Sequence, residues 1–301
     1  MPNNSGTICC ILNGGAGTAA AASDLESKVA ELFAAHGARP KILVAHKGDD
    51  MTAMAAAEIE RGASLVVAGG GDGTINAVAS ALIGKDVTFG VLPLGTLNHF
   101  AKDLNIPLAL DAAIANLFTG RAAPVDAAEV NDRVFLNNSS LGLYPAIVRQ
   151  REEIQKTGHG KWPAFVQAMA YALWRYSALH IDVGVAGIDR TEEKTPFIFI
   201  GNNRYEVAGL DIGKRARLDE GRLWVYRAPR TNRAGLFVMA LRALFGRNKP
   251  RELQIFDAES FEVRTRRRHP LVSTDGEVVR LAAPLRYRIH PRALRVIVPA
   301  A

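Results

Sequence analysis

Residues 66–76 read VVAGGGDGTIN, and this stretch decides the fold of the chain. Its apolar start predicts a buried strand, its glycines predict a loop, and the residues after Thr74 follow a helical pattern. A strand, glycine loop and helix in this order expose backbone N–H groups that can bind phosphate. A second such loop, PLGTLN at residues 93–98, follows a predicted strand over 87–92. Together the two loops predict a nucleotide site and a nucleotide-dependent phosphotransferase.

The first 124 residues alternate strand and helix patterns around these loops. A capping box, Ser23 with Glu26, predicts where the first helix starts. Strands separated by helices of about this length predict a parallel sheet covered on both faces, so we expect a Rossmann-like α/β domain over residues 1–124. The predicted strands are 8–12, 41–45, 65–68 and 87–92, and the predicted helices are 23–36, 51–61, 75–83 and 110–118.

Past Pro124 the pattern changes to apolar and polar residues in alternation, which is typical of half-buried antiparallel strands. We therefore expect an antiparallel β domain over residues 125–301. Two amphipathic helical stretches interrupt it, at 162–176 and 234–245, and they suit either a core or a bilayer interface. The predicted strands are 134–138, 180–185, 196–200, 223–226, 261–265, 285–289 and 294–298.

The formal charge of +7 favours an anionic partner. No zinc spacing and no interleaving of aromatic with basic residues accompanies the basic clusters, which argues against nucleic acid. An anionic membrane surface suits them at least as well, so we expect transient membrane contact and a lipid substrate. The clusters are Lys214-Arg215 with Arg217, residues 247–251, and Arg264 with residues 266–268.

The first six residues are polar and lack the basic and apolar stretches of an export signal. No apolar run approaches the ~18 residues that a membrane-spanning helix needs. Cys9 and Cys10 are adjacent in an apolar run, as expected of buried thiols in a reducing compartment. We expect a cytoplasmic protein with peripheral membrane association, and the sequence leaves its oligomeric state open, a homodimer included.

Several polar residues in and near the loops are candidates for chemistry. Asp72 could bind Mg²⁺ through water, hold a sugar hydroxyl or accept loop amides. Thr74 and Asn76 suit helix capping or phosphate contact. A glycine-rich turn, NGGAG at residues 13–17, follows the first strand and is a weaker signal of the same kind. Taken alone, the DGE at residues 275–277 reads as a hairpin turn.

In combination these segments resemble the diacylglycerol kinase catalytic-domain family, in particular its bacterial lipid-kinase branch, which is related to sphingosine kinase. The resemblance rests first on GGDGT at 70–74 and PLGTLNHFA at 93–101. Later segments agree in order: GNN at 201–203, ARLDEGRL at 216–223 and DGE at 275–277. The similarity therefore extends along nearly the whole chain.

The resemblance implies an N-terminal α/β domain, a C-terminal β-sandwich, and transfer of the ATP γ-phosphate to a lipid hydroxyl with Mg²⁺. It implies Glu277 as general base, with Asp275 as the alternative, and Asp72 as a residue that helps to hold Mg-ATP. A structural Mg²⁺ would be bound by the Glu220 carboxylate and the backbone carbonyls of Arg217 and Arg222. The implied ATP-binding residues are Asn13, Gly14, Gly15, Ala16, Gly17, His46, Gly70, Gly71, Asp72, Gly73, Thr74, Ile75, Asn76, Gly95, Thr96 and Asn98.

The chain also departs from the family's usual residues. Gly14 stands where proline is usual, Thr18 where a basic residue is common, and His99 and Glu220 where aspartates are usual. These changes motivate a second hypothesis, a nucleotide- or lipid-binding regulator on the same fold without catalysis. A third, NAD kinase, shares the Gly-Gly-Asp-Gly-Thr loop but typically has an Asn-Glu dipeptide downstream, and no such dipeptide occurs here.

Overall fold

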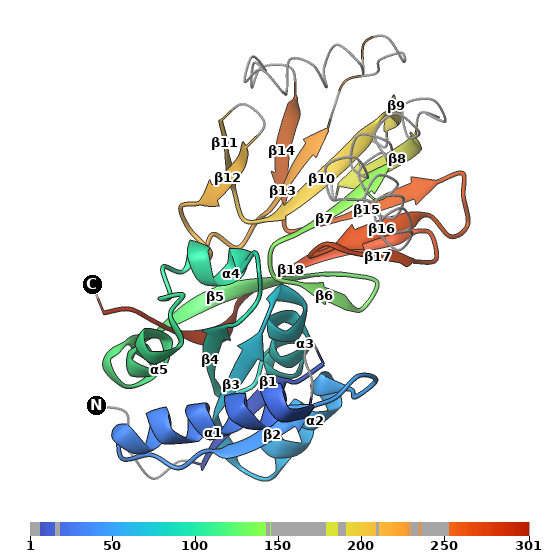
Figure 1. Ribbon diagram of the computed structural model, residues 1–301. Helices are drawn as coiled ribbons and strands as arrows, with labels where there is room; N and C mark the ends of the chain where they lie inside the picture. The colour runs from blue at the N-terminus through green and yellow to red at the C-terminus, as the bar shows by residue number, and fades with distance from the viewer. Residues whose placement is uncertain are drawn as a thin grey trace. The chain divides into compact units, whose positions relative to one another are not determined.

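The computed structural model describes residues 7–15, 19–142, 145, 179–185, 191–208, 211–227, 229, 235 and 253–300. The chain divides into two compact units. The first unit comprises Met1–Ala127 together with Pro291–Ala301, and the second comprises Ala128–His290 (Figure 1). Within the described part of the chain, no helix is long and apolar enough to cross a bilayer.

The first unit is an α/β domain with a parallel sheet, as predicted. Its strands follow the order β2-β1-β3-β4, and the end of β18 (Leu285–Val298) pairs in parallel with β4, where Arg295 lies beside Thr88. The other elements are β1 (Thr7–Asn13), α1 (Ala19–Ala35), β2 (Lys41–Ala45), α2 (Met51–Glu60), β3 (Ala63–Gly70), α3 (Asp72–Leu82), β4 (Thr88–Pro93), α4 (His99–Asp103) and α5 (Leu110–Thr119).

Both faces of this sheet are covered, which explains its nearly continuous apolar strands. Cys10 and Leu12 of β1 pack in one core with Phe33 of α1 and Ile114 of α5. Helices α2 and α3 pack on each other and on β3, and α1 contacts α5 (Figure 1). The alternate β1 residues, such as Ile11, are also fully buried. The strands thus place their carboxyl ends, and the loops that follow them, at one edge of the sheet.

The second unit consists of antiparallel sheets. One has the order β14-β13-β10-β7-β16-β17, a second contains the start of β18 with β15, β8 and β9, and β11 pairs with β12. The elements are β5 (Arg121–Val130), β6 (Arg133–Phe135), β7 (Asn138–Gly142), β8 (Leu179–Val185), β9 (Thr191–Thr195), β10 (Phe197–Asn202), β11 (Tyr205–Ala208), β12 (Asp211–Arg215), β13 (Leu223–Arg227), β14 (Gln254–Ala258), β15 (Ser260–Thr265), β16 (Leu271–Thr274) and β17 (Glu277–Arg280).

The core of this unit lies between the two larger sheets. Ile198 and Val225 of the six-stranded sheet belong to the same buried cluster as Val263 and Tyr287 of the other. The Phe261 and Tyr287 rings stack within it at 4.9 Å between centroids. Two antiparallel sheets that share one apolar core form a β-sandwich, the architecture expected for this part of the chain.

Some predicted boundaries were wrong. Helix α1 begins at Ala19, so Ser23 lies inside it and is not its N-cap. Strand β3 continues to Gly70 and α3 begins at Asp72, which leaves Gly71 as the N-cap. The short helix α4 was not predicted. The strands predicted over 285–289 and 294–298 are the single strand β18. The helical stretches predicted over 162–176 and 234–245 lie outside the described residues.

The predicted division of the chain, 1–124 and 125–301, also differs from the structure. The boundary falls after Ala127, inside β5, and the segment after His290 belongs to the first unit. The segment after His290 belongs to the first unit because it pairs with β4 through backbone hydrogen bonds and because Ile297 packs in the core of that unit.

Candidate functional site

Three loops follow β1, β3 and β4 at the same edge of the parallel sheet of the first unit. The first two are joined by one side-chain hydrogen bond, and a second bond shapes the first loop. Asn13 Nδ2 donates to Thr74 Oγ1 over 2.8 Å, while Asn13 Oδ1 accepts from the Gly15 N–H over 2.9 Å. Asn13 therefore holds the first glycine turn against the start of α3.

The second and third loops touch through their backbones. A Cβ added at Gly95 would lie closer than 3.0 Å to the Gly71 Cα, and one added at Gly70 would lie 2.5 Å from Thr74 Oγ1. Because the obstacle at Gly95 is backbone, no side chain can move aside to admit a Cβ. Glycine at position 95 is therefore required for the two loops to meet, and glycine at position 70 leaves room for the Thr74 side chain.

Asp72 links the same two loops through its carboxylate. Its two oxygens accept the backbone N–H groups of His99 and Phe100, each over 3.2 Å, at the start of α4. Next to this contact, Asn98 has a left-handed φ of 51°, and its Oδ1 accepts the Gly95 N–H. Of the three roles considered for Asp72, the structure shows the acceptance of loop amides.

Helix α3 begins at this junction without a side-chain cap. The first hydrogen bond of the helix runs from the Ile75 N–H to the Gly71 carbonyl over 3.0 Å. The N–H groups of the three residues before Ile75 therefore have no acceptor within the helix, and they and the helix dipole favour an anion there. Helix α3 spans Asp72–Leu82, long enough for both effects. The three joined loops thus surround the start of one helix, whose first N–H groups are of the kind that bind phosphate.

We expect Asp72→Ala to loosen the third loop, because two amides lose their acceptor. Hydrogen exchange of the His99 and Phe100 amides should accelerate about 5-fold or more, as the loss of a capping acceptor costs about 1 kcal/mol. Asp50→Ala is the matched control: Asp50 caps α2 through the Thr52 and Ala53 N–H groups. It should lower stability similarly without weakening ATP binding. Unchanged exchange at His99 would contradict this role for Asp72.

The other candidates around the first loop are placed as follows. The Gly14 N–H donates to the Ala45 carbonyl over 2.9 Å, and a Cβ on Gly14 would meet Val44. His46 follows β2, beside β1 in the sheet, and is exposed. The side chain of Ile75 is fully buried, so only its backbone can serve a ligand. Gly73 is exposed in the first turn of α3, Thr96 is exposed in the third loop, and Asn76 lies in the second turn of α3. Ala16 and Gly17 lie outside the described residues.

In the second unit, Asp275 occupies the turn between β16 and β17. It has a φ of 47° and Gly276 a φ of 87°, as in a tight hairpin. Its carboxylate accepts three backbone N–H groups from residues 136–138, over 2.8, 2.8 and 3.0 Å. Burial raises the pKa of Asp275 to about 6, and these amides and Arg215 act in the opposite direction. The residue itself is half-buried, so part of it stays accessible.

Glu277, two residues later, has different surroundings. Its carboxylate forms an ion pair with Arg133, and its side chain is 65% exposed. Arg133 also donates through Nε to Thr274 Oγ1 over 2.8 Å. The structure therefore separates the two acids of the DGE turn: Asp275 is fixed by backbone donors, and Glu277 is a solvated ion-pair partner.

Arg215 was predicted to meet anionic lipid, and this was wrong. It is only 2% exposed. Its Nη1 donates to the carbonyls of Leu136 and Asn202 over 2.7 and 3.0 Å, and its Nη2 donates to Asn137 Oδ1 over 2.7 Å. Arg215 was assigned to an exposed basic cluster because Lys214 and Arg217 are also basic, and these two neighbours are exposed in the structure.

Comparison with known proteins agrees with these features. Residues 7–130 match the diacylglycerol kinase catalytic domain, and residues 144–298 match the YegS C-terminal NAD kinase beta sandwich-like domain. The chain belongs to the diacylglycerol kinase family, in its bacterial lipid-kinase branch. Family membership makes it a kinase.

Two relatives and one solved structure illustrate this membership. A probable lipid kinase YegS-like of Pseudomonas aeruginosa is 32% identical over 250 residues, which cover 79% of this chain and 78% of that protein. The protein of the same name from Cronobacter sakazakii is 35% identical over 171 residues, 54% of this chain and 56% of its own length. A putative diacylglycerol kinase structure from Bacillus anthracis covers 97% of each chain, with a TM-score of 0.73 and 20% identity, and shows the same fold.

The structural metal site that the family implies can be tested against Glu220. Its Oε2 accepts the Arg204 N–H and the Trp224 Nε1–H over 3.3 and 3.1 Å, and within the described part of the chain its Oε1 accepts no hydrogen bond. The carbonyl of Arg222 accepts the Asn203 N–H over 3.0 Å. One carboxylate oxygen and two loop carbonyls are the hard ligands that Mg²⁺ prefers, so this donor set fits the ion, with water needed to complete its coordination.

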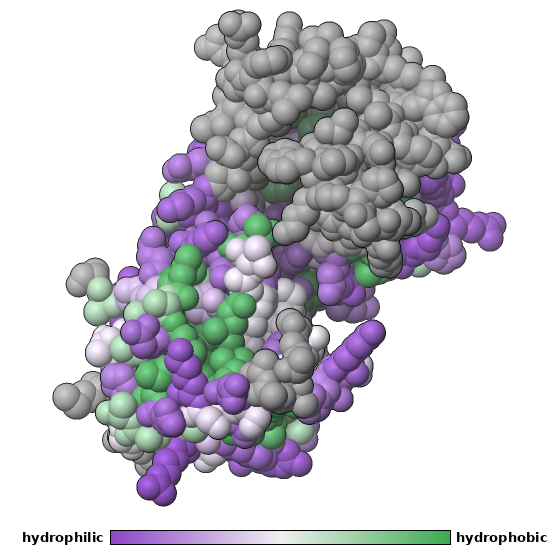
Figure 2. Space-filling model, in the orientation of Figure 1, coloured by the Kyte–Doolittle hydropathy of each residue, from purple (hydrophilic) through white to green (hydrophobic). Residues whose placement is uncertain are grey.

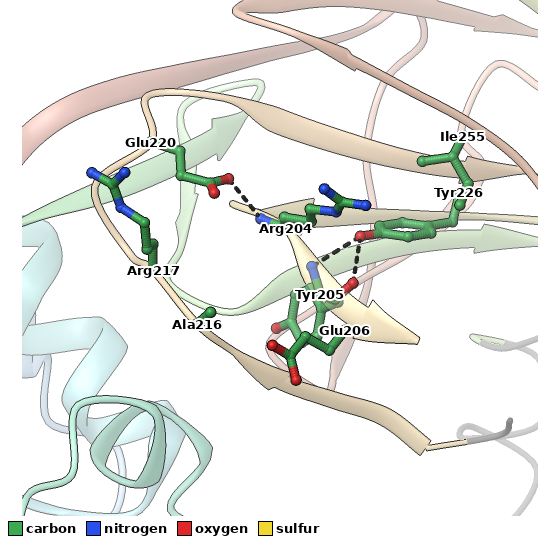
Figure 3. Close-up of a pocket in the computed structure, with 8 residues that line it drawn as sticks. All are labelled: Arg204, Tyr205, Glu206, Ala216, Arg217, Glu220, Tyr226 and Ile255. Carbon is green, nitrogen blue, oxygen red and sulfur yellow. Dashed lines mark hydrogen bonds between the residues drawn. The ribbon is translucent and has the colours of Figure 1, made fainter. Parts of the chain in front are cut away.

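Glu220 also lines a cavity of about 460 Å³ in the second unit. Figure 3 shows Glu220 directed toward the backbone of Arg204, and the Tyr226 hydroxyl bonded to both backbone groups of Tyr205. The Arg204 guanidinium lies over the Trp224 ring at 4.8 Å. The described residues contain no cluster of three or more His, Cys, Asp or Glu side chains that could hold a metal. Any ion at Glu220 would therefore depend on backbone carbonyls.

Proposed function

We propose that this kinase transfers the γ-phosphoryl group of ATP to a hydroxyl of a diacylglycerol-type or related lipid. The observation that carries the proposal is the joining of three glycine loops at the start of α3 by Asn13, Asp72 and the Gly71–Gly95 contact. Nucleotide phosphates would bind to the backbone N–H groups of these loops. The side chains of Asn13 and Asp72 would keep the loops in register while the phosphates bind.

In this proposal Mg²⁺ accompanies ATP and neutralises charge on its phosphates. The lipid hydroxyl oxygen attacks the γ-phosphorus and loses its proton to a carboxylate, and the bond to the β-phosphate oxygen breaks, so that ADP leaves with the electron pair. Glu220, with the carbonyls of Arg217 and Arg222, would hold the structural Mg²⁺.

We infer that Asp275, rather than Glu277, accepts the proton. A general base works best when its pKa lies near the working pH, and burial brings the pKa of Asp275 to about 6. Glu277 is instead solvated and paired with Arg133. This reverses the order of preference that the family resemblance implied for the two acids.

Surface properties support a lipid acceptor. Leu97 and Leu108, 58% and 49% exposed, precede and follow α4, and Figure 2 shows apolar side chains gathered on that part of the first unit. In the second unit, Arg266, Arg267 and Arg268 are all exposed. Each basic residue near an anionic bilayer contributes about 1 kcal/mol to binding. We propose peripheral association with anionic membranes on this basis; the basic cluster at 247–251 lies outside the described residues.

The test is to incubate the protein with Mg-ATP labelled at the γ-phosphate and vesicles that contain diacylglycerol, a sphingoid base or phosphatidylglycerol. We expect label to enter one lipid, and to be lost with Asp275→Asn. Binding of ATP without label in any lipid would contradict the proposal and favour the catalytically silent regulator. Label transferred to NAD in a parallel reaction would instead favour the NAD kinase hypothesis.

A further inference from the structure

Residues 136–138 connect β6 to β7, and we call them the strap. Every backbone N–H of the strap points to one group: those of Leu136, Asn137 and Asn138 all donate to the Asp275 carboxylate. The strap therefore fixes where the Asp275 oxygens lie. Anything that fixes the strap also fixes Asp275.

The opposite side of the strap is bound by Arg215. The Leu136 carbonyl and Asn137 Oδ1 each accept from its guanidinium over 2.7 Å. A third bond, to the Asn202 carbonyl, ties the same guanidinium to the end of β10. Asn202 completes the attachment, because its N–H donates to the Asn137 carbonyl and its Nδ2 to the Leu136 carbonyl, both over 2.9 Å.

A buried guanidinium with these partners has an electrostatic effect as well as a structural one. It is only 2% exposed, so water screens its positive charge weakly. Among the described residues, the other charged groups near Asp275 are Arg133, which bonds the neighbouring Thr274, and Glu277. These two form a partly exposed ion pair with each other, whereas the buried charge of Arg215 lowers the pKa of Asp275.

We propose that Arg215 is a positioning residue for Asp275: through the strap it holds the carboxylate in place, and through its charge it keeps the carboxylate ionised. This inference rests on the proposed function of Asp275 as the acceptor of the lipid proton. The planar guanidinium is needed because it reaches three oxygens from two nitrogens in one plane, which an ammonium cannot do. The positive charge of Arg215 favours the ionised carboxylate, because it lowers the pKa of Asp275 that burial raises.

The experiment compares Arg215→Met and Arg215→Lys with a matched control, Arg227→Met. Arg227 lies in the same unit and donates through Nε to Gln254 Oε1 over 2.9 Å, so its removal takes away one positive charge of that unit without removing a donor to the strap. For each variant, the pH dependence of kcat is measured, and Asp275 is titrated by NMR with ¹³C-labelled aspartate, its signal assigned by its absence from Asp275→Asn. Thermal unfolding reports whether each variant is folded.

We expect Arg215→Met to move the titration of Asp275, and the rising limb of the pH profile, upward by on the order of one unit. Arg215→Lys should keep both midpoints near those of the wild type, because the positive charge remains. It should lower kcat, because the ammonium cannot replace the two nitrogens with which the guanidinium bonds the strap. Arg227→Met should change neither. If Arg215→Met does not fold, Asn137→Ala, which removes one acceptor of the guanidinium, should give a smaller shift in the same direction.

The two readouts separate this inference from the proposed function. An Asp275 titration that is the same in wild type and Arg215→Met would overturn the inference, whatever the activity. A shifted titration with an unchanged pH profile would leave the coupling to Arg215 intact and show that Asp275 is not the base. A shifted titration in a protein that phosphorylates no lipid would reject the proposed function alone.

Discussion

Asp275→Asn is expected to reduce kcat for lipid phosphorylation by about 10²–10⁴-fold, the usual contribution of a general base. The amide is a neutral group that cannot take the hydroxyl proton. In the wild type, activity should rise with pH around 6, where Asp275 ionises, and level off above it. The measurement is kcat between about pH 5 and 8 on vesicles of the lipid that accepts label.

Glu277→Gln is the control, since it removes the neighbouring acid of the same turn and leaves the three strap amides with their acceptor. We expect a loss much smaller than that of Asp275→Asn, caused by release of Arg133. If Glu277→Gln were the more damaging substitution, Glu277 would be the base and the assignment to Asp275 would be wrong.

Asp275→Asn should also change how the free energy of unfolding depends on pH. The pKa of Asp275 is raised from 3.8 to about 6, so the folded state binds this proton more tightly than the unfolded state. Its contribution to folding is thus fully present below about pH 4 and is lost as pH rises through 6, about 3 kcal/mol in all. Asp275→Asn should remove this slope from the unfolding free energy measured by urea denaturation at each pH.

Gly95→Ala should destabilise the first unit by about 1–3 kcal/mol and abolish measurable ATP binding. The new methyl would overlap the Gly71 Cα, and two backbones must then separate because neither has a side chain to rotate. Separation also moves the donors of the second and third loops apart. The readouts are thermal unfolding without nucleotide and ATP titration by calorimetry.

Gly71→Ala approaches the same contact from the other side and serves as the matched control. A Cβ on Gly71 would lie 3.4 Å from the Gly95 Cα, an ordinary contact, and Gly71 has a φ of −84° that any residue adopts. We expect its unfolding temperature to match that of the wild type. Equal destabilisation by the two substitutions would show that the close approach of the loops does not decide the effect.

The sequence was sufficient to predict the α/β unit, because its strands are buried on both faces and its glycine turns recur after them. Such local patterns predict secondary structure, because strand and helix periodicity and turn residues are visible in short stretches of sequence. The alternation of apolar and polar residues likewise predicted the antiparallel strands of the second unit. The sequence also predicted that the loops joined in the structure by Asn13 and Asp72 form one nucleotide site, and this stays a prediction.

The partners of individual side chains were not predictable in the same way. Asp275 bonds amides about 138 positions earlier in the chain, and Asp72 bonds amides 27 and 28 positions later. No local spacing encodes such contacts. Arg215 was misassigned because a basic residue close to two other basic residues suggests a solvated cluster. Only the fold shows that three oxygens accept hydrogen bonds from its guanidinium.

The return of β18 to the first unit has a consequence for how the chain matures during synthesis. Strand β4 obtains its parallel neighbour from residues after His290, which leave the ribosome only after the whole second unit has been made. Until then, the β4 edge carries unpaired backbone groups that can pair with another chain. The first unit is therefore begun before the second unit and completed after it, and a nascent chain arrested after residue 127 would lack the strand that pairs with β4.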